Sequence, residues 1–272
     1  MQQILSASAG RRTLLWGCIM VVAWPCAVLD AGTAQLAGAT DLLVQLGDAS
    51  VRLLSSAPAS AGLTYVSVHE NEQTAVTAAR QLIARRGGRL LELRAQRQRL
   101  VSFGIEGVRY TFDPNRIFTA PGIEKTLRRY GPYTQAAHNA VAHLAEVIIE
   151  QVQRNLTPPI VAVHNNGAGS LSVQSYQRGG PLQAEVTEVS VHPQRDPDDF
   201  FLATERSLYE RLHKLQFNVV LQSPRATDDG SLSVFCQQRG VPYLNVEAEY
   251  GHLAEQVRML EAVLAVVGDR AT

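Results

Sequence analysis

The chain has 272 residues, of which 46% are hydrophobic and 18% are charged. This composition excludes disorder over most of the chain and is sufficient for one domain of about 200 residues or more. The 25 acidic and 25 basic residues leave a formal net charge of zero, so bulk electrostatics predicts no nucleic-acid partner. Arginines cluster between positions 80 and 99, where we expect a solvated surface; a patch for an anionic partner is the alternative.

Residues 1–34 have the features of a bacterial export signal. Arg11 and Arg12 precede an apolar stretch over residues 14–29, and small residues follow at 31–34, which is the order found in cleavable signals. The apolar stretch of about 16 residues is short for a membrane span of about 20. We therefore expect cleavage near Ala34 and a periplasmic location, with no membrane contact beyond this segment; an uncleaved anchor is the alternative.

The segment after the signal differs in composition from the rest of the chain. Residues 35–62 are rich in Ala, Ser and Gly, and we expect a loosely ordered lead-in to a folded domain over residues 63–272. Cys18 and Cys26 would be removed with the signal. Cys236 is then the remaining thiol of the mature protein, and we expect it to be free and buried.

Strand and helix patterns alternate after residue 62. Strands are expected at 63–69, 90–93, 100–103, 108–112, 160–164, 218–222 and 243–247, and helices at 72–86, 133–153, 198–215, 231–239 and 253–267. Apolar residues recur at helical spacing in the first helix, and several strands are apolar throughout. These patterns predict an α/β fold of three layers, α/β/α, with a mixed, mostly parallel central sheet covered on both faces.

Three of the apolar strands end in a residue that can bind or serve a metal: His69, His164 and Glu247. In open α/β sheets, ligands bind at the carboxyl ends of the strands. Glu72 follows His69 by three residues, so both side chains can reach one ion if a helix begins there. Taken alone, this pair more often has a surface or capping role. With His164 added, two histidines and one carboxylate have the composition of a catalytic zinc site with an open fourth position.

The segment Asp113-Pro114-Asn115-Arg116 adds a candidate substrate contact. Arg116 can bind a carboxylate through two charged hydrogen bonds, and the amide of Asn115 can add another. A turn is the alternative, because Asp-Pro-Asn favours one. Arg109 is a second cation, able to stabilise the oxygen of a polarised carbonyl.

Four motifs together resemble the zinc carboxypeptidase superfamily in order and approximate spacing. They are His69-x-x-Glu72, the segment 109–118 (RYTFDPNRIF), the segment 163–165 (VHN) and the segment 246–248 (VEA). The aspartoacylase and succinylglutamate desuccinylase branch is the most similar, because an Asp-Leu-Asn-Arg-x-Phe stretch occupies the place of residues 113–118; Pro114 replaces the usual Leu. The resemblance covers about residues 64–260 and implies a zinc carboxypeptidase-like hydrolase domain.

The resemblance assigns the catalytic roles. It implies that His69, Glu72 and His164 bind one zinc ion and that Glu247 is the general base. Glu249 is an alternative base, because alternation along a strand places residues 247 and 249 on the same side.

The resemblance also assigns the substrate contacts. Asn115 and Arg116 would hold a substrate carboxylate, and Arg109 would assist the zinc in stabilising the oxyanion. The Tyr that closes over substrate in classical carboxypeptidases has no obvious counterpart, although Tyr250 or Tyr176 could reach the site.

These observations predict an exported zinc-dependent hydrolase that cleaves an amide bond beside a free carboxylate. Export favours a peptide substrate, cell-wall peptides included. An N-acyl amino acid deacylase and a non-catalytic metal-binding or peptide-binding module of the same fold are the alternatives. The segment Asp228-Asp229-Gly230-Ser231 lies outside the family pattern. We expect a helix N-cap there, with the acidic residues beside the first turn, and recognition of a substrate amine is the alternative.

Overall fold

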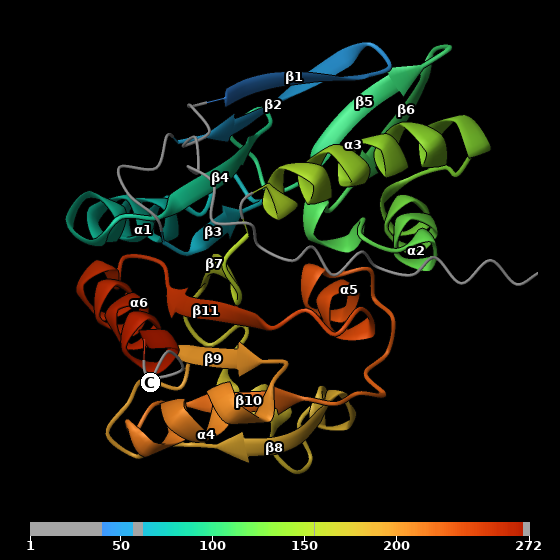
Figure 1. The fold of residues 1–272 in the computed structure, drawn as a ribbon. Coiled ribbons are helices and arrows are strands. Elements are labelled where there is room, and N and C mark those ends of the chain that lie inside the picture. Colours follow the sequence, from blue (N-terminus) through green and yellow to red (C-terminus); the bar gives the residue numbers. More distant parts are fainter. Residues whose placement is uncertain (1–39, 57–61, 155, 269–272) are drawn as a thin grey trace, which may run out of the picture. The chain divides into compact units, whose positions relative to one another are not determined.

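The structure is a computed structural model that describes residues 40–56, 62–154 and 156–268 (Figure 1). The predicted export signal or anchor at residues 1–34 lies outside the described residues. Among the helices that are described, none combines the length and the apolar character needed to cross a membrane.

The described residues form a nine-stranded sheet in the order β1-β2-β4-β3-β7-β11-β9-β10-β8 and a separate hairpin of β5 and β6. The four central strands β4, β3, β7 and β11 are mutually parallel, and antiparallel pairings occur on both sides of them. The strands are β1 Thr40–Leu46, β2 Ala49–Ser55, β3 Thr64–Ser67, β4 Arg89–Arg94, β5 Val101–Ile105, β6 Val108–Phe112, β7 Ile160–Asn166, β8 Val186–Ser190, β9 Phe200–Ala203, β10 Val219–Gln222 and β11 Tyr243–Glu249.

Helices cover both faces of the sheet (Figure 1). One face packs against α1 Gln73–Arg86, α4 Arg206–Lys214 and α6 Leu253–Gly268. The other packs against α2 Ala120–Tyr130, α3 Gln135–Gln153, α5 Leu232–Gln238 and the β5–β6 hairpin. Short 3-10 turns lie at η1 Pro114–Arg116, η2 Val173–Tyr176 and η3 Gln183–Glu185. The predicted three-layer α/β/α fold with a mixed sheet is confirmed.

The apolar residues of the central strands are divided between two cores, one on each face of the sheet. In β3, Tyr65 belongs to the core beneath α1, α4 and α6, whereas Val66 belongs to the opposite core. In β7, Val161 and Ala162 divide in the same way. Alternation of period two thus distributes an apolar run between both faces.

The expectation of a loosely ordered lead-in over residues 35–62 is wrong for its central part. Strands β1 and β2 form an antiparallel hairpin, and β2 continues the sheet by pairing with β4. Leu46, Val51 and Leu53 are almost completely buried in the same core as the β5–β6 hairpin. The Ala, Ser and Gly residues on either side of the hairpin obscured the strand pattern that Leu and Val form between positions 42 and 54. The folded domain therefore includes residues before position 63.

Two further expectations need correction. Residues 200–203 form the buried strand β9, so the helix expected at 198–215 is limited to α4. Helix α2 was not expected, because Pro121 and Gly122 in its first turn resemble a loop. Proline is in fact tolerated in the first turn of a helix, where its missing N–H would have no partner. Thr119 caps this helix by accepting a hydrogen bond from the backbone N–H of Gly122.

Candidate metal and active site

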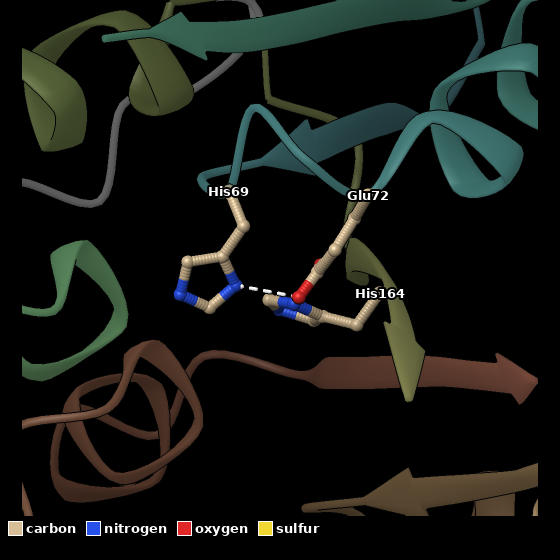
Figure 2. Close-up of side chains that lie close together, drawn as sticks. All are labelled: His69, Glu72 and His164. Atoms are coloured by element: carbon tan, nitrogen blue, oxygen red, sulfur yellow. Dashed lines mark hydrogen bonds and ion pairs between the residues drawn. The ribbon is translucent and has the colours of Figure 1, made fainter. Parts of the chain in front are cut away.

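Parallel strands β3 and β7 bring the two histidines of the candidate metal site together. Tyr65 and Val66 pair with Val161 and Ala162, so the carboxyl ends of both strands lie at one edge of the sheet. His69 follows β3 and His164 lies within β7. Figure 2 shows their rings and the Glu72 side chain converging on one point.

Glu72 contacts both imidazoles. Its Oε1 lies 2.9 Å from Nδ1 of His69, and its Oε2 lies 2.8 Å from Nδ1 of His164. Glu72 is the N-cap residue of α1, but its side chain makes no capping hydrogen bond. The carboxylate is therefore directed to the histidines.

The chemistry of these three residues suits a metal-binding group. Their ligand atoms all lie within 4.8 Å of one another, and all three side chains are buried. Within the described part of the chain, His164 Nε2 is buried without a hydrogen-bond partner, which is costly unless another group satisfies it. Two imidazoles and a carboxylate suit a divalent transition metal. The predicted ligands thus lie together, and the group could hold an ion.

The electrostatics of the group favours a charged carboxylate. Burial alone would raise the pKa of Glu72, but His164 and His69 outweigh burial and hold that pKa far below its ordinary value. Burial alone would lower the pKa of His69, but Glu72 and Asp113 outweigh it and raise that pKa. The negative charges therefore attract a cation to this position, whether a proton or a metal ion.

Asp113 holds His69 from the other side of its ring. The Nε2 atom of His69 lies 2.8 Å from Oδ1 of Asp113, and this oxygen also accepts the backbone N–H of Asn115. Such a carboxylate fixes the orientation of a ligating imidazole, so that Nδ1 faces Glu72. Sequence reasoning included Asp113 in the 113–118 motif, with a turn as the alternative, but gave it no contact with His69.

Glu247 lies beside the metal-binding group. It pairs in register with His164 across β11 and β7, is 6% exposed and lines the same cavity as His164. Burial is the main cause that raises the pKa of Glu247, and the nearby charge of Glu72 adds to the rise. The amide of Asn245 donates a 3.0 Å hydrogen bond to Oε1 of Glu247 and orients it.

Glu249, the alternative base, lies in a different cluster. Its neighbours are Asp196 and His252, and its backbone N–H donates to Asp199. It is not among the residues that line the cavity around His164. Of the two predicted candidates, Glu247 is thus the one that lies at the cavity.

Asn115 and Arg116 lie on η1 and line the cavity. Arg116 is anchored by its own chain and by a neighbouring loop: its guanidinium donates to the carbonyl of Asn115 at 2.7 Å, and its Nε lies 3.4 Å from Asp229. Its side chain remains 37% exposed, so it is accessible to a substrate. Asp228 accepts hydrogen bonds from Thr119 and from the N–H of Gly230, which gives it a structural role.

Arg109 is not brought to this cavity. It is exposed on β6, opposite Gly104 in the hairpin, and the residues that line the cavity do not include it. Arg99 lies there instead, with one guanidinium nitrogen 2.6 Å from Oε1 of Glu72 and the other 3.6 Å from Asp113. Sequence reasoning placed Arg99 in a solvated surface, and nothing in its local pattern distinguished it from the neighbouring arginines.

One cavity of about 560 Å³ joins these groups. Its lining includes two residues of the candidate metal-binding group, a buried carboxylate, an Asn-Arg pair and a further arginine: Glu72, His164, Glu247, Asn115, Arg116 and Arg99. Tyr250 lies at the same cavity with 61% of its surface exposed, whereas Tyr176 is buried and packs against Phe200. Tyr250 is thus the tyrosine that can reach a bound molecule.

Comparison with solved structures finds similar chains. A succinylglutamate desuccinylase/aspartoacylase family protein from Shewanella amazonensis is 13% identical, with a TM-score of 0.40 over 85% of this chain and 73% of that chain. A metallo-carboxypeptidase from Burkholderia cenocepacia is also 13% identical, with a TM-score of 0.43 over 86% and 66%. The names of these proteins match the superfamily that the sequence motifs indicated. No family model matches the chain. No curated protein matches it either.

Proposed function

We propose that this protein is a zinc-dependent hydrolase that cleaves an amide bond beside a free carboxylate. The observation that carries the proposal is one cavity lined by Glu72 and His164 of the His-Glu-His group, the buried carboxylate of Glu247 and an Asn-Arg pair. A zinc ion bound by His69, Glu72 and His164 would polarise the scissile carbonyl and lower the pKa of a water molecule.

Glu247 would transfer the proton in this reaction. A buried carboxylate with a raised pKa accepts a proton more readily at neutral pH than an ordinary glutamate, and can return that proton to the leaving nitrogen. Asn245 restricts the rotation of this carboxylate through its hydrogen bond. Proton removal from water and proton delivery to the amine are then performed by the same group.

Asn115 and Arg116 would hold the free carboxylate of the substrate. A guanidinium binds a carboxylate through two parallel hydrogen bonds, which fixes the position of the scissile bond as well as adding affinity. Arg99 replaces Arg109 in our proposal as the cation that stabilises negative charge on the carbonyl oxygen, because Arg99 lies beside Glu72.

A peptide is the substrate that we favour, and export to the periplasm, where cell-wall peptides occur, is part of the proposal. The exposed side chains of Arg116 and Tyr250 at the cavity support a cleft that can admit a longer molecule. A deacylase for N-acyl amino acids would instead enclose its substrate. Incubation with muropeptides and with N-acyl amino acids, followed by mass spectrometry, distinguishes these substrate classes.

The Glu247→Gln variant tests turnover directly. We expect it to keep one zinc ion per chain while its hydrolysis rate falls by a factor of about 10² to 10⁴, because the proton acceptor is lost and the ligands are unchanged. Glu249→Gln is the matched control and should retain activity. Metal content is measured by elemental analysis and the rate by product release. Full activity in Glu247→Gln, or in metal-depleted protein, would contradict the mechanism.

A further inference from the structure

Helix α1 lacks the cap that its N-cap residue normally provides. Glu72 is the N-cap residue, but its side chain makes no capping hydrogen bond, because the carboxylate contacts His69 and His164 instead. The first backbone N–H groups of a helix need acceptors from outside the helix, and the N-cap side chain usually serves the second or third residue. Another acceptor is therefore needed at this end of α1.

Asn165 supplies that acceptor from a different element. Its Oδ1 accepts the backbone N–H of Ala75, the third residue of α1, at 2.8 Å. Asn165 lies on β7 directly after His164. Two successive residues of one strand thus serve the same site: His164 belongs to the metal-binding group, and Asn165 holds the helix whose N-cap residue, Glu72, belongs to it as well.

The position of Asn165 is otherwise an apolar one. Side chains alternate along β7, so Asn165 shares a face with Val161 and Val163, which belong to the core beneath α1, α4 and α6. A buried amide is costly in such a place unless its hydrogen bonds are made. The Asn165 amide donates to the carbonyl of Ala248 at 3.2 Å and to Oε1 of Gln256 at 2.9 Å. Although Asn165 lines the active-site cavity, its N–H groups are therefore already used within the chain.

Gln256 fixes the orientation of Asn165. It is fully buried in α6, and its Nε2 donates to the backbone carbonyl of His164 at 2.9 Å, which leaves Oε1 as the acceptor for Asn165. With the two ends of the Gln256 amide engaged in this way, the N–H groups of Asn165 face Gln256 and its Oδ1 faces Ala75. Together, Asn165 and Gln256 connect α1, β7, β11 and α6 beside the metal-binding group.

We propose that Asn165 caps α1 in place of Glu72 and so frees the Glu72 carboxylate to bind the metal, with Gln256 as the residue that orients Asn165. Both are positioning residues, because neither amide belongs to the metal-binding group. The inference rests on the proposed function for the identity of the metal. Without the Asn165 amide, the N–H of Ala75 would draw the Glu72 carboxylate into the ordinary role of an N-cap side chain, in competition with the metal.

The zinc affinity of the full chain, measured by competition with a chelator, tests this role without turnover. Asn165→Ala should weaken zinc binding by a factor of about 10 to 100. Val163→Ala is the matched control, since it removes buried apolar atoms from the same face of the same strand and leaves the cap in place; it should bind zinc as the unmodified protein does. An unchanged affinity in Asn165→Ala, or an equal loss in both variants, would overturn the inference.

A double-mutant cycle identifies the path of the effect. If Asn165 acts through Glu72, Asn165→Ala should change the zinc affinity by no more than about twofold in a Glu72→Ala background, because the carboxylate that it frees is absent. A loss in that background as large as the loss in the unmodified background would mean that Asn165 acts through another ligand. That result would overturn the capping role.

Amide hydrogen exchange at Ala75, followed by NMR, measures the cap itself. In the zinc-saturated protein the Glu72 carboxylate is held by the metal and cannot replace a lost cap. The N–H of Ala75 should then exchange about tenfold faster in Asn165→Ala than in the unmodified protein. An unchanged exchange rate would overturn the inference.

Turnover is measured separately with muropeptides and N-acyl amino acids. A protein that shows the zinc and exchange effects but cleaves neither substrate class would contradict the proposed function and leave the positioning role standing. Zinc-dependent cleavage of either class, with a zinc affinity that Asn165→Ala does not change, would contradict the positioning role and leave the hydrolase standing.

Discussion

Glu72 is the residue around which the candidate metal site is arranged. Its carboxylate contacts His69, His164 and Arg99, and it is only 2% exposed. A buried carboxylate of this kind is stable only with compensating positive charge and hydrogen bonds. The same contacts orient both imidazoles with their Nδ1 atoms facing the carboxylate of Glu72. One side chain therefore orients both histidines and also carries the negative charge that the histidines and Arg99 compensate.

Asp113 should determine how tightly a metal is held. Asp113→Asn should weaken zinc binding by a factor of about 10 to 100, because the amide orients and polarises the imidazole of His69 less than a carboxylate does. The affinity is measured by competition with a chelator. Asp199→Asn is a suitable control, since Asp199 is equally buried but contacts His252 and Glu249 instead. An unchanged affinity in Asp113→Asn would contradict an orienting role.

Glu247 should make the metal-free protein less stable as the pH rises. Burial is the chief cause that raises the pKa of Glu247 in the folded protein. Below the pKa that Glu247 has in the unfolded chain, the group is protonated in both states, so no charge has to be buried on folding. Above the folded pKa the charged group must remain buried, and stability is lost. Glu247→Gln should therefore be more stable than the unmodified metal-free protein at pH 7, with a smaller difference at pH 4. Denaturant unfolding at both values tests this, and a difference that is equal at both would contradict it.

At the scale of elements, the position of Asn115 and Arg116, which form our proposed carboxylate clamp, depends on a close backbone contact. Gly122 in α2 lies so close to Gly230 that an added Cβ would be 2.2 Å from Cα of Gly230 and 2.9 Å from the carbonyl oxygen of Arg116. The N–H of Phe118 donates to the carbonyl of Gly230 at 2.9 Å. Gly230 has a φ of +80°, which favours glycine. Helix α2, η1 and the loop at Gly230 are thus packed without side chains between them.

Gly122→Ala should displace the clamp and leave the metal site intact. We expect kcat/KM on substrates with a free carboxylate to fall by roughly tenfold to a hundredfold, because Arg116 is moved from its productive position. Zinc stoichiometry should not change. Gly131→Ala at the C-cap of the same helix is the control, since an added Cβ there meets only the carbonyl oxygen of Arg109 at an ordinary 3.8 Å. Loss of zinc together with activity would show that the two parts are not independent.

An element or a site residue could be predicted from the sequence where the local pattern alone determines its structure. His69, His164 and Glu247 were found because apolar strands have a clear pattern and parallel strands end at one edge. Arg99 could not be found, because it lies in the loop between β4 and β5, and the path of a loop depends on tertiary packing. Strand β9 was missed because a four-residue apolar run beside a helical pattern is ambiguous between strand and helix.

At the scale of the whole molecule, the β1–β2 hairpin extends the sheet beyond β4. It buries Leu46, Val51 and Leu53 in the core shared with α3 and the β5–β6 hairpin. Each fully buried side chain of this size contributes about 1.5 to 3 kcal/mol. The hairpin therefore contributes an amount comparable with the total stability of a typical domain, which is about 5 to 15 kcal/mol.

Truncation tests this boundary. A chain that begins at Leu36, the start of the compact unit, should fold and bind zinc as the full chain does. A chain that begins at Leu63 should be unstable, because its core loses the hairpin and β4 becomes an unpaired edge. Soluble yield and thermal unfolding measure the difference. Equal unfolding midpoints for the two chains would show that β1 and β2 are dispensable.

The proposed catalytic residues and the proposed carboxylate-binding residues lie on different elements of the fold. Glu247 and His164 lie side by side on β11 and β7, whereas Asn115 and Arg116 lie on a short turn held by α2 and Gly230. Under the proposed function, exchanging segments 113–130 and 227–231 for others should change the substrate preference while His164 and Glu247 keep their positions. Variant libraries that aim at a new substrate preference should therefore be limited to those two segments.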